Sequence, residues 1–385
     1  MKKWILGLGA SLLVASRAFA LSIPAPALDA NAWLLLDAKS NEIIAEHNAD
    51  ARIQPASLTK IMTAYLVFKA IHDHQLSMDQ TVTVSTLAWK VDPESSKMFL
   101  KPGDRVTIRQ LLTGLLVDSG NDAAVALAEA TAGSVGTFVA EMNQMAAHMG
   151  LKSTHFASPH GLPSPETYST ARDLSELARH LIQDYPKLYV GFDTIKQYTY
   201  DKITQQNRNK LLWIDPSVDG LKTGHTAEAG YCLIASAHRP GATVDRRLIS
   251  VVLGTPSSKA RVQESETLLN WGFGNFDTVK LYGKQQVVAT PRVWKGEQDQ
   301  VKVGFTHDVY LTVGRGAKLL GVPKVTTKGP LVAPIAADAQ VASLTETVGD
   351  RTVTLPLVAL HPVGQAGFFG RAWDTVALWV SRKMG

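Results

Sequence analysis

A serine and a lysine lie three residues apart in the short polar segment PASLTK, residues 55–60, just ahead of the apolar run IMTAYLVFKAI. Three residues is close to one helical turn, so we expect the Ser57 hydroxyl and the Lys60 amine on one face of a helix. A hydroxyl is a weak nucleophile that needs a nearby proton acceptor, and a neutral amine can serve. The pair is therefore a candidate nucleophile with its base, and a serine that only caps a helix is the alternative.

Two further stretches hold polar residues at positions where a site could form. Ser119-Gly120-Asn121 stands directly before a helical pattern at 121–132, and Lys222-Thr223-Gly224 stands just before an apolar strand-like run at 231–237. Taken singly, the first is an ordinary turn with a helix cap and the second an ordinary hairpin. Chance rarely produces all three motifs in this order at average composition, so the set predicts one site.

Together the motifs resemble the S-x-x-K, S-x-N and K-T-G set of penicillin-binding proteins and active-site-serine β-lactamases. The chain is most similar to the low-molecular-mass, serine-type D-alanyl-D-alanine carboxypeptidases of peptidase family S11. That resemblance runs through PASLTKIMTAY, MFLKPGD, SGNDAAVALAE, HGL at 160–162, VDGLKTGHTAEAGYCL and ESETLLNWGF. It implies removal of the terminal D-alanine from the peptidoglycan pentapeptide through an acyl-Ser57 intermediate, inhibition by β-lactams, and no cofactor.

The resemblance also implies a role for each residue of the first two motifs. Lys60 would be the base for Ser57, kept neutral part of the time by burial or by the second cation, Lys222. Ser119 would relay a proton between that lysine and the leaving amine. Asn121 would hold the amide of the peptide and orient the lysine.

The remaining site residues are expected to bind the end of the substrate. Lys222 would supply positive charge, and Thr223 would bond the terminal carboxylate. Gly224 would let the substrate backbone approach the strand edge. The resemblance implies an oxyanion hole made by the backbone N–H groups of the nucleophile and of His225. Arg261 would help to hold the carboxylate, and an exposed helical arginine is the alternative.

Other functions fit the same motifs less well. An active-site-serine β-lactamase needs a carboxylate that activates water, in the common class within an E-x-x-L-N motif, whereas this chain has PETYST at 165–170. A catalytically inactive penicillin-fold binding protein is a second alternative, against which the complete motif set argues. No metal site is expected, because His72 and His74 form an H-x-H pair but residue 76 is a leucine and not a third ligand.

The order of the expected elements predicts an α+β catalytic domain over residues 21–278. A hairpin around 39–41 and strands at 231–237 and 247–253 enclose helices at 57–72, 107–117, 121–132, 136–149 and 171–183, and another helix follows at 258–271. Strands at both ends of a helical block indicate an antiparallel sheet with flanking helices and an inserted helical lobe. By resemblance this is the penicillin-binding/β-lactamase-like transpeptidase fold.

The character of the chain changes after residue 279. Short β-branched runs such as QVKVGF, DVYLTV and TVTLPLVAL predict a small all-β domain over 279–365. The last segment, 366–385, places Phe369, Trp373, Val376, Trp379 and Val380 at helical spacing, with Arg382 and Lys383 near its end. It is too short and interrupted to cross a bilayer, so it predicts an amphipathic helix on the membrane surface, with docking on the β domain as the alternative.

The N-terminus predicts export. Two lysines, an apolar stretch and Ala18-Phe19-Ala20 have the layout of a signal peptide over residues 1–20. Its removal takes away Lys2, Lys3 and Arg17, so the net charge falls from +5 to 5 − 3 = +2, which carries no case for nucleic acid. Cys232 is the only cysteine, so no internal disulfide can form. We expect a periplasmic enzyme attached to the outer face of the inner membrane, with peptidoglycan stems and β-lactams as its partners.

Overall fold

The computed structural model describes residues 23–241 and 244–384, so the predicted signal peptide lies outside the described residues. Two compact units make up the chain. The first comprises Ala25–Lys280 with Tyr310–Arg315, and the second comprises mainly Leu281–Val309 and Gly316–Gly385. The second unit therefore begins two residues after the expected boundary, and a short segment of it returns to the first unit.

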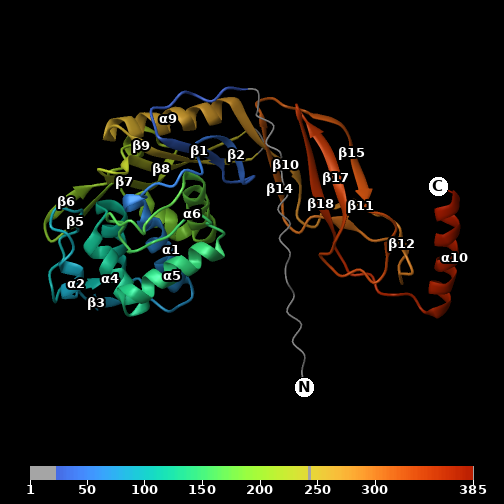
Figure 1. Cartoon of the computed structure of the whole chain (residues 1–385), viewed down its shortest axis with the longest axis horizontal. Coiled ribbons are helices and arrows are strands. Elements are labelled where there is room, and N and C mark those ends of the chain that lie inside the picture. The colour runs from blue at the N-terminus through green and yellow to red at the C-terminus, as the bar shows by residue number, and fades with distance from the viewer. Residues whose placement is uncertain (1–22, 242–243, 385) are drawn as a thin grey trace, which may run out of the picture. The chain divides into compact units, whose positions relative to one another are not determined.

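A five-stranded antiparallel sheet organises the first unit, in the order β2 (Glu42–His47), β1 (Ala32–Asp37), β9 (Arg246–Thr255), β8 (Gly230–Arg239), β7 (Val218–Thr226). β1 and β2 come from the start of the unit and the other three strands from its end. Figure 1 shows α9 (Ser258–Asn275) along one face of this sheet and the helices between β2 and β7 at the other. The sequence predicted a sheet built from segments far apart in the chain, and the structure has such a sheet.

Helices fill the segment between β2 and β7. They are the 3₁₀ helix η1 (Ala56–Thr59), α1 (Lys60–His72), α2 (Thr86–Trp89), α3 (Ile108–Thr113), the π-helical turn η2 (Gly114–Asp118), α4 (Asn121–Ala132), α5 (Val135–His148), α6 (Ala171–Asp184), α7 (Pro186–Asp193) and α8 (Leu211–Ile214). Two small hairpins accompany them: β3 (Thr81–Thr83) with β4 (Arg105–Thr107), and β5 (Gln197–Tyr200) with β6 (Ile203–Gln206).

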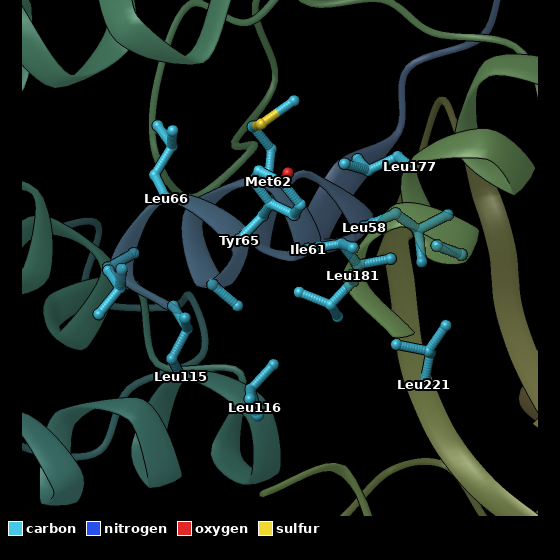
Figure 2. Close-up of a cluster of buried hydrophobic side chains, with 14 of the residues drawn as sticks. Leu58, Ile61, Met62, Tyr65, Leu66, Leu115, Leu116, Leu177, Leu181 and Leu221 are labelled. Atoms are coloured by element: carbon cyan, nitrogen blue, oxygen red, sulfur yellow. The ribbon is translucent and has the colours of Figure 1, made fainter. Parts of the chain in front are cut away.

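α1 lies at the centre of the core of the first unit. Its sequence is apolar on nearly every face, which is typical of a helix buried on all sides. Figure 2 shows side chains of α1, among them Ile61 and Met62, packed with Leu115 from η2, Leu181 from α6 and Leu221 from β7. The N-terminus of this helix, where Lys60 lies, is therefore held in a dry and rigid setting.

A second sheet organises the other unit, in the order β11 (Val287–Ala289), β13 (Val303–Gly304), β18 (Arg351–Ala359), β17 (Gln340–Val348), β15 (Leu319–Thr327). β12 (Val293–Trp294) pairs with β16 (Leu331–Val332). A further pair, β10 (Phe276–Tyr282) with β14 (Val309–Gly314), belongs mostly to the first unit. A small separate core lies on the sheet, including Val303, Leu344 and Leu357. The chain ends in the helix α10 (Phe368–Met384).

Candidate active site

The Ser57 hydroxyl and the Lys60 amine lie side by side, with Lys60 Nζ 2.9 Å from Ser57 Oγ. Ser57 belongs to η1 and Lys60 is the first residue of α1, so the one-turn spacing becomes a direct contact. No side-chain capping bond is made at the start of either helix. This removes the alternative in which Ser57 only caps a helix.

Burial makes Lys60 a base. Its side chain is fully buried, and Nζ also lies 2.6 Å from Asn121 Oδ1 and 2.8 Å from the His160 carbonyl oxygen. Burial first, and then the charges of Lys222 and Arg208, lower the pKa of Lys60 well below its usual value. A neutral amine has two N–H donors for the two oxygens and one lone pair, which remains for the proton of the Ser57 hydroxyl.

Ser119 connects η2 to α4 in a left-handed conformation, with φ 60° and ψ 33°. Such a conformation costs a residue with a side chain about 1–2 kcal/mol and often marks a functional position. The Ser119 side chain is buried, and its Oγ has no hydrogen-bond partner among the described residues. α4 starts two residues later at Asn121, whose Oδ1 is occupied by Lys60. The Asn121 amide nitrogen is therefore the group that can donate to a substrate.

The third motif lies within β7, the edge strand of the sheet, and the expected strand at 231–237 follows it as part of β8. An edge strand has free backbone groups on its outer side, where an extended peptide can pair. Lys222 is buried, and burial followed by the charges of Arg208 and Arg261 lowers its pKa to about 7. A Cβ on Gly224 would lie only 3.0 Å from the Pro55 carbonyl oxygen. The glycine thus lets β7 pack against the helix that carries the nucleophile, a reason that the sequence did not indicate.

Arg261 and His225 meet at the same end of the site. Arg261 is 4% exposed, so the alternative of an exposed helical arginine is wrong. Its Nη1 donates to the Gly224 carbonyl oxygen at 3.1 Å, and its buried Nε has no partner among the described residues. Burial, the largest cause, lowers the pKa of Arg261 to about 10. The exposed His225 ring stacks on Tyr231 with 4.0 Å between ring centroids, which suits a structural role for the ring.

One cleft of about 350 Å³ brings these groups together. Of the nine predicted residues, Lys60 and Lys222 are buried, and the other seven line the cleft: Ser57, Ser119, Asn121, Thr223, Gly224, His225 and Arg261. The arrangement combines a nucleophile, a neutral amine and a second hydroxyl with several positive charges. Such a cleft can transfer an acyl group from a substrate that ends in a carboxylate.

Several functional groups were not predicted from the sequence. The His160 carbonyl oxygen binds Lys60, and Arg208 lines the cleft and hydrogen-bonds Ser96. Asp118, directly before Ser119, is buried, and burial followed by the charge of Asp122 raises its pKa to about 7. Of these three residues, only His160 lies in a stretch, HGL, that carries the family resemblance. Arg208 and Asp118 lie in no motif from which their place at the site could have been predicted.

Comparison with known proteins decides the family. Residues 19–257 match the family described as D-alanyl-D-alanine carboxypeptidase, and residues 276–365 match the penicillin-binding protein 5 C-terminal domain. The chain belongs to the D-alanyl-D-alanine carboxypeptidase family. The prediction of that family, and of its α+β fold followed by an all-β domain, is confirmed. The second match ends at residue 365, so neither match covers α10.

Individual relatives extend over nearly the whole chain. D-alanyl-D-alanine carboxypeptidase DacC of Escherichia coli is 42% identical over 375 residues, covering 95% of this chain and 92% of the relative. The structure of penicillin-binding protein 5 from Haemophilus influenzae superposes with a TM-score of 0.84 at 38% identity, over 89% of this chain and 100% of that one. Penicillin-binding protein D2 from Listeria monocytogenes, in its ampicillin-bound form, has a TM-score of 0.58 at 34% identity, over 65% of this chain and 100% of that one.

Within residues 23–241 and 244–384, no group of three or more His, Cys, Asp or Glu side chains is placed to hold a metal ion. In the same ranges no single helix is long and apolar enough to span a bilayer, although α4 and α5, with a bend of 85° between them, together have the necessary length and composition.

Proposed function

We propose that the protein is a serine-type D-Ala-D-Ala carboxypeptidase that removes the terminal D-alanine from the peptidoglycan pentapeptide and is acylated by β-lactams at the same residue. The observation that carries this proposal is the 2.9 Å contact of Ser57 Oγ with the buried Lys60 amine, in a cleft that also holds Arg261. Membership of the carboxypeptidase family fixes the enzyme class.

The reaction starts at Ser57. Lys60 Nζ accepts the hydroxyl proton while Ser57 Oγ attacks the carbonyl carbon of the penultimate D-alanine. Collapse of the tetrahedral intermediate breaks the peptide bond, and the proton passes from Lys60 through the unpartnered Ser119 hydroxyl to the leaving amine. Water then attacks the acyl-Ser57 ester, with Lys60 again accepting a proton, and the shortened peptide leaves.

Substrate recognition follows from the charge of the cleft. Thr223 and Arg261 line it, and Lys222 lies buried next to Thr223, whose carbonyl oxygen is 3.3 Å from Lys222 Nζ. A terminal carboxylate is attracted to such a cluster, because burial weakens the screening of its charges by water. We assign Thr223 and Arg261 as its hydrogen-bond donors. The free Asn121 amide nitrogen would donate to the carbonyl oxygen of the residue that precedes D-Ala-D-Ala.

We also propose that α10 attaches the exported enzyme peripherally to the outer face of the inner membrane. Phe369, Trp373 and Trp379 of this helix are 87%, 77% and 60% exposed. On another side of the helix Leu378 is buried, and Asp374 accepts a hydrogen bond from the Lys295 backbone, so docking and membrane contact use different side chains. Burying the three aromatic rings in lipid would yield on the order of 10 kcal/mol, before partial insertion and ordering reduce it.

The function is tested by incubating the purified protein with a labelled penicillin and, separately, with a peptide ending in D-Ala-D-Ala. We expect stable label on Ser57 together with release of D-alanine. Rapid penicillin hydrolysis without D-alanine release would show a β-lactamase instead. Stable label without turnover of any peptide would show a binding protein without catalytic activity.

A further inference from the structure

The cleft has a direction, which follows from where its charges lie. Arg261 marks the end that attracts the terminal carboxylate, and Ser57 marks the carbonyl that is attacked. Asn121 comes next, and its backbone N–H donates to the Ser96 carbonyl oxygen at 2.8 Å. The segment Glu94–Ser96 is therefore joined to Asn121 and forms part of the cleft wall, which all three of its residues line. A peptide that runs from Arg261 past Ser57 and Asn121 meets this wall with the residue that precedes D-Ala-D-Ala.

Glu94 differs from every other described residue that lines the cleft, because it is the only acid among them. A turn fixes its backbone: the Glu94 N–H donates to Asp92 Oδ1 at 2.9 Å, and Ser95 Oγ donates to the Asp92 carbonyl oxygen at 2.7 Å. The carboxylate itself is exposed and has no hydrogen bond or ion pair within the described part of the chain. The neighbouring cation, Arg208, is engaged with Ser96 instead.

An unpaired carboxylate held at the wall of an otherwise cationic cleft is suited to a cation on the substrate. We propose that Glu94 is a specificity-determining residue that binds a free side-chain ammonium group on the residue directly before D-Ala-D-Ala. The enzyme then prefers stem peptides that carry an amine-bearing diamino acid at this position. This inference rests on the proposed function, because it needs the peptide to lie in the cleft with its carboxylate at Arg261.

The test compares two peptides on the full-length enzyme, acetyl-L-lysyl-D-Ala-D-Ala and the same peptide acetylated on the lysine side chain. The measured quantity is kcat/KM for D-alanine release, at low and at high ionic strength. The variant is Glu94→Gln. The matched control is Asp92→Asn, which removes an equal charge two residues away, keeps the oxygen that accepts the Glu94 N–H, and changes a residue outside the cleft lining.

We expect the wild-type enzyme to favour the free amine about three- to fivefold at low salt, as is usual for a solvent-exposed ion pair, and less at high salt. Glu94→Gln should bring the ratio near one by slowing only the free-amine peptide, and Asp92→Asn should keep the preference. An equal loss on both peptides, an unchanged ratio in Glu94→Gln, or the same loss of preference in Asp92→Asn would overturn the inference.

Failure of the proposed function gives a different pattern. If neither peptide releases D-alanine, the carboxypeptidase assignment fails and this inference fails with it. If both peptides are cleaved at equal rates by the wild-type enzyme, and the labelled penicillin still marks Ser57, only the role of Glu94 is overturned.

Discussion

Replacing Lys60 by methionine tests the base directly, because methionine keeps a long unbranched side chain and removes the proton acceptor. The amine is held by three oxygens, Ser57 Oγ at 2.9 Å, Asn121 Oδ1 at 2.6 Å and the His160 carbonyl at 2.8 Å. A positioned general base contributes about 10²–10⁴-fold to a rate. We expect the upper half of this range, about 10³–10⁴-fold, since Asn121 also loses the group that orients it. At about 1.4 kcal/mol for each factor of ten, the barrier rises by roughly 4–5.5 kcal/mol.

The assay for this variant is the rate of Ser57 acylation by a labelled penicillin, together with D-alanine release and a thermal unfolding curve. Lys69→Met is the matched control, because Lys69 belongs to the same helix but is exposed and pairs with Asp73. The wild-type rate should rise with pH, since Lys60 acts only when neutral, and its lowered pKa moves this rise far below pH 10.5. A Lys60→Met enzyme that acylates within tenfold of the wild type, or keeps the same pH profile, would refute Lys60 as the base.

Four further predictions address the carboxylate pocket, the backbone and the tail. Lys222 has a pKa of about 7, so its amine is charged below this pH and neutral above it. KM for a free-acid peptide should therefore rise as pH increases through about 7, whereas KM for the peptide amide should not. An equal rise in both KM values would contradict a role of Lys222 in binding the carboxylate. Arg261→Ala should lower kcat/KM for the free acid about tenfold more than for the amide, and an equal loss would indicate a purely structural arginine. Gly161→Ala should lower the free energy of unfolding by about 3 kcal/mol or more, because its φ is +80° and a Cβ would lie 2.0 Å from a backbone oxygen of η1. The control Gly133→Ala has φ +76° with open space, so denaturant curves should show a loss of only about 1–2 kcal/mol, and equal losses would exclude the clash. Deleting residues 366–385 should give an active enzyme that no longer binds anionic vesicles. If the truncated enzyme still binds the vesicles, the membrane anchor lies elsewhere in the chain. If the truncated enzyme unfolds, α10 belongs to the core of the second unit.

The parts of the fold and site that rest on local patterns could be predicted from the sequence. Ser57 and Lys60 are one helical turn apart. The structure has η1 followed by α1 where a single helix was expected, and the two side chains still lie on the same face. The helix after the second motif begins at Asn121 as expected. These features depend on residues close together in the chain, where periodicity and turn chemistry determine the geometry.

The remaining parts depend on contacts between distant segments. Arg208 reaches the cleft from the end of the β5–β6 hairpin, and the burial of Arg261 depends on packing of α9 against the sheet. No local pattern at either position distinguishes it from a surface arginine, and Arg261 was expected at the site only through the family resemblance. The left-handed backbone of Ser119 likewise follows from its place between η2 and α4, since serine has no preference for that conformation.

The apolar surroundings of α1 also determine how this enzyme can change over generations of mutation. The leucines and isoleucine in Figure 2 stabilise the lobe, and the same packing keeps water from the Lys60 amine. A substitution that hydrates this core would raise the pKa of the amine, so activity at neutral pH would fall before the protein unfolds. Acylation by a β-lactam and by the natural peptide would decline together, because both use the same neutral amine. Substitutions in this core that slow acylation by a β-lactam would therefore also slow turnover of the natural peptide. Substitutions that slow acylation by the β-lactam alone should instead arise among the residues that line the cleft.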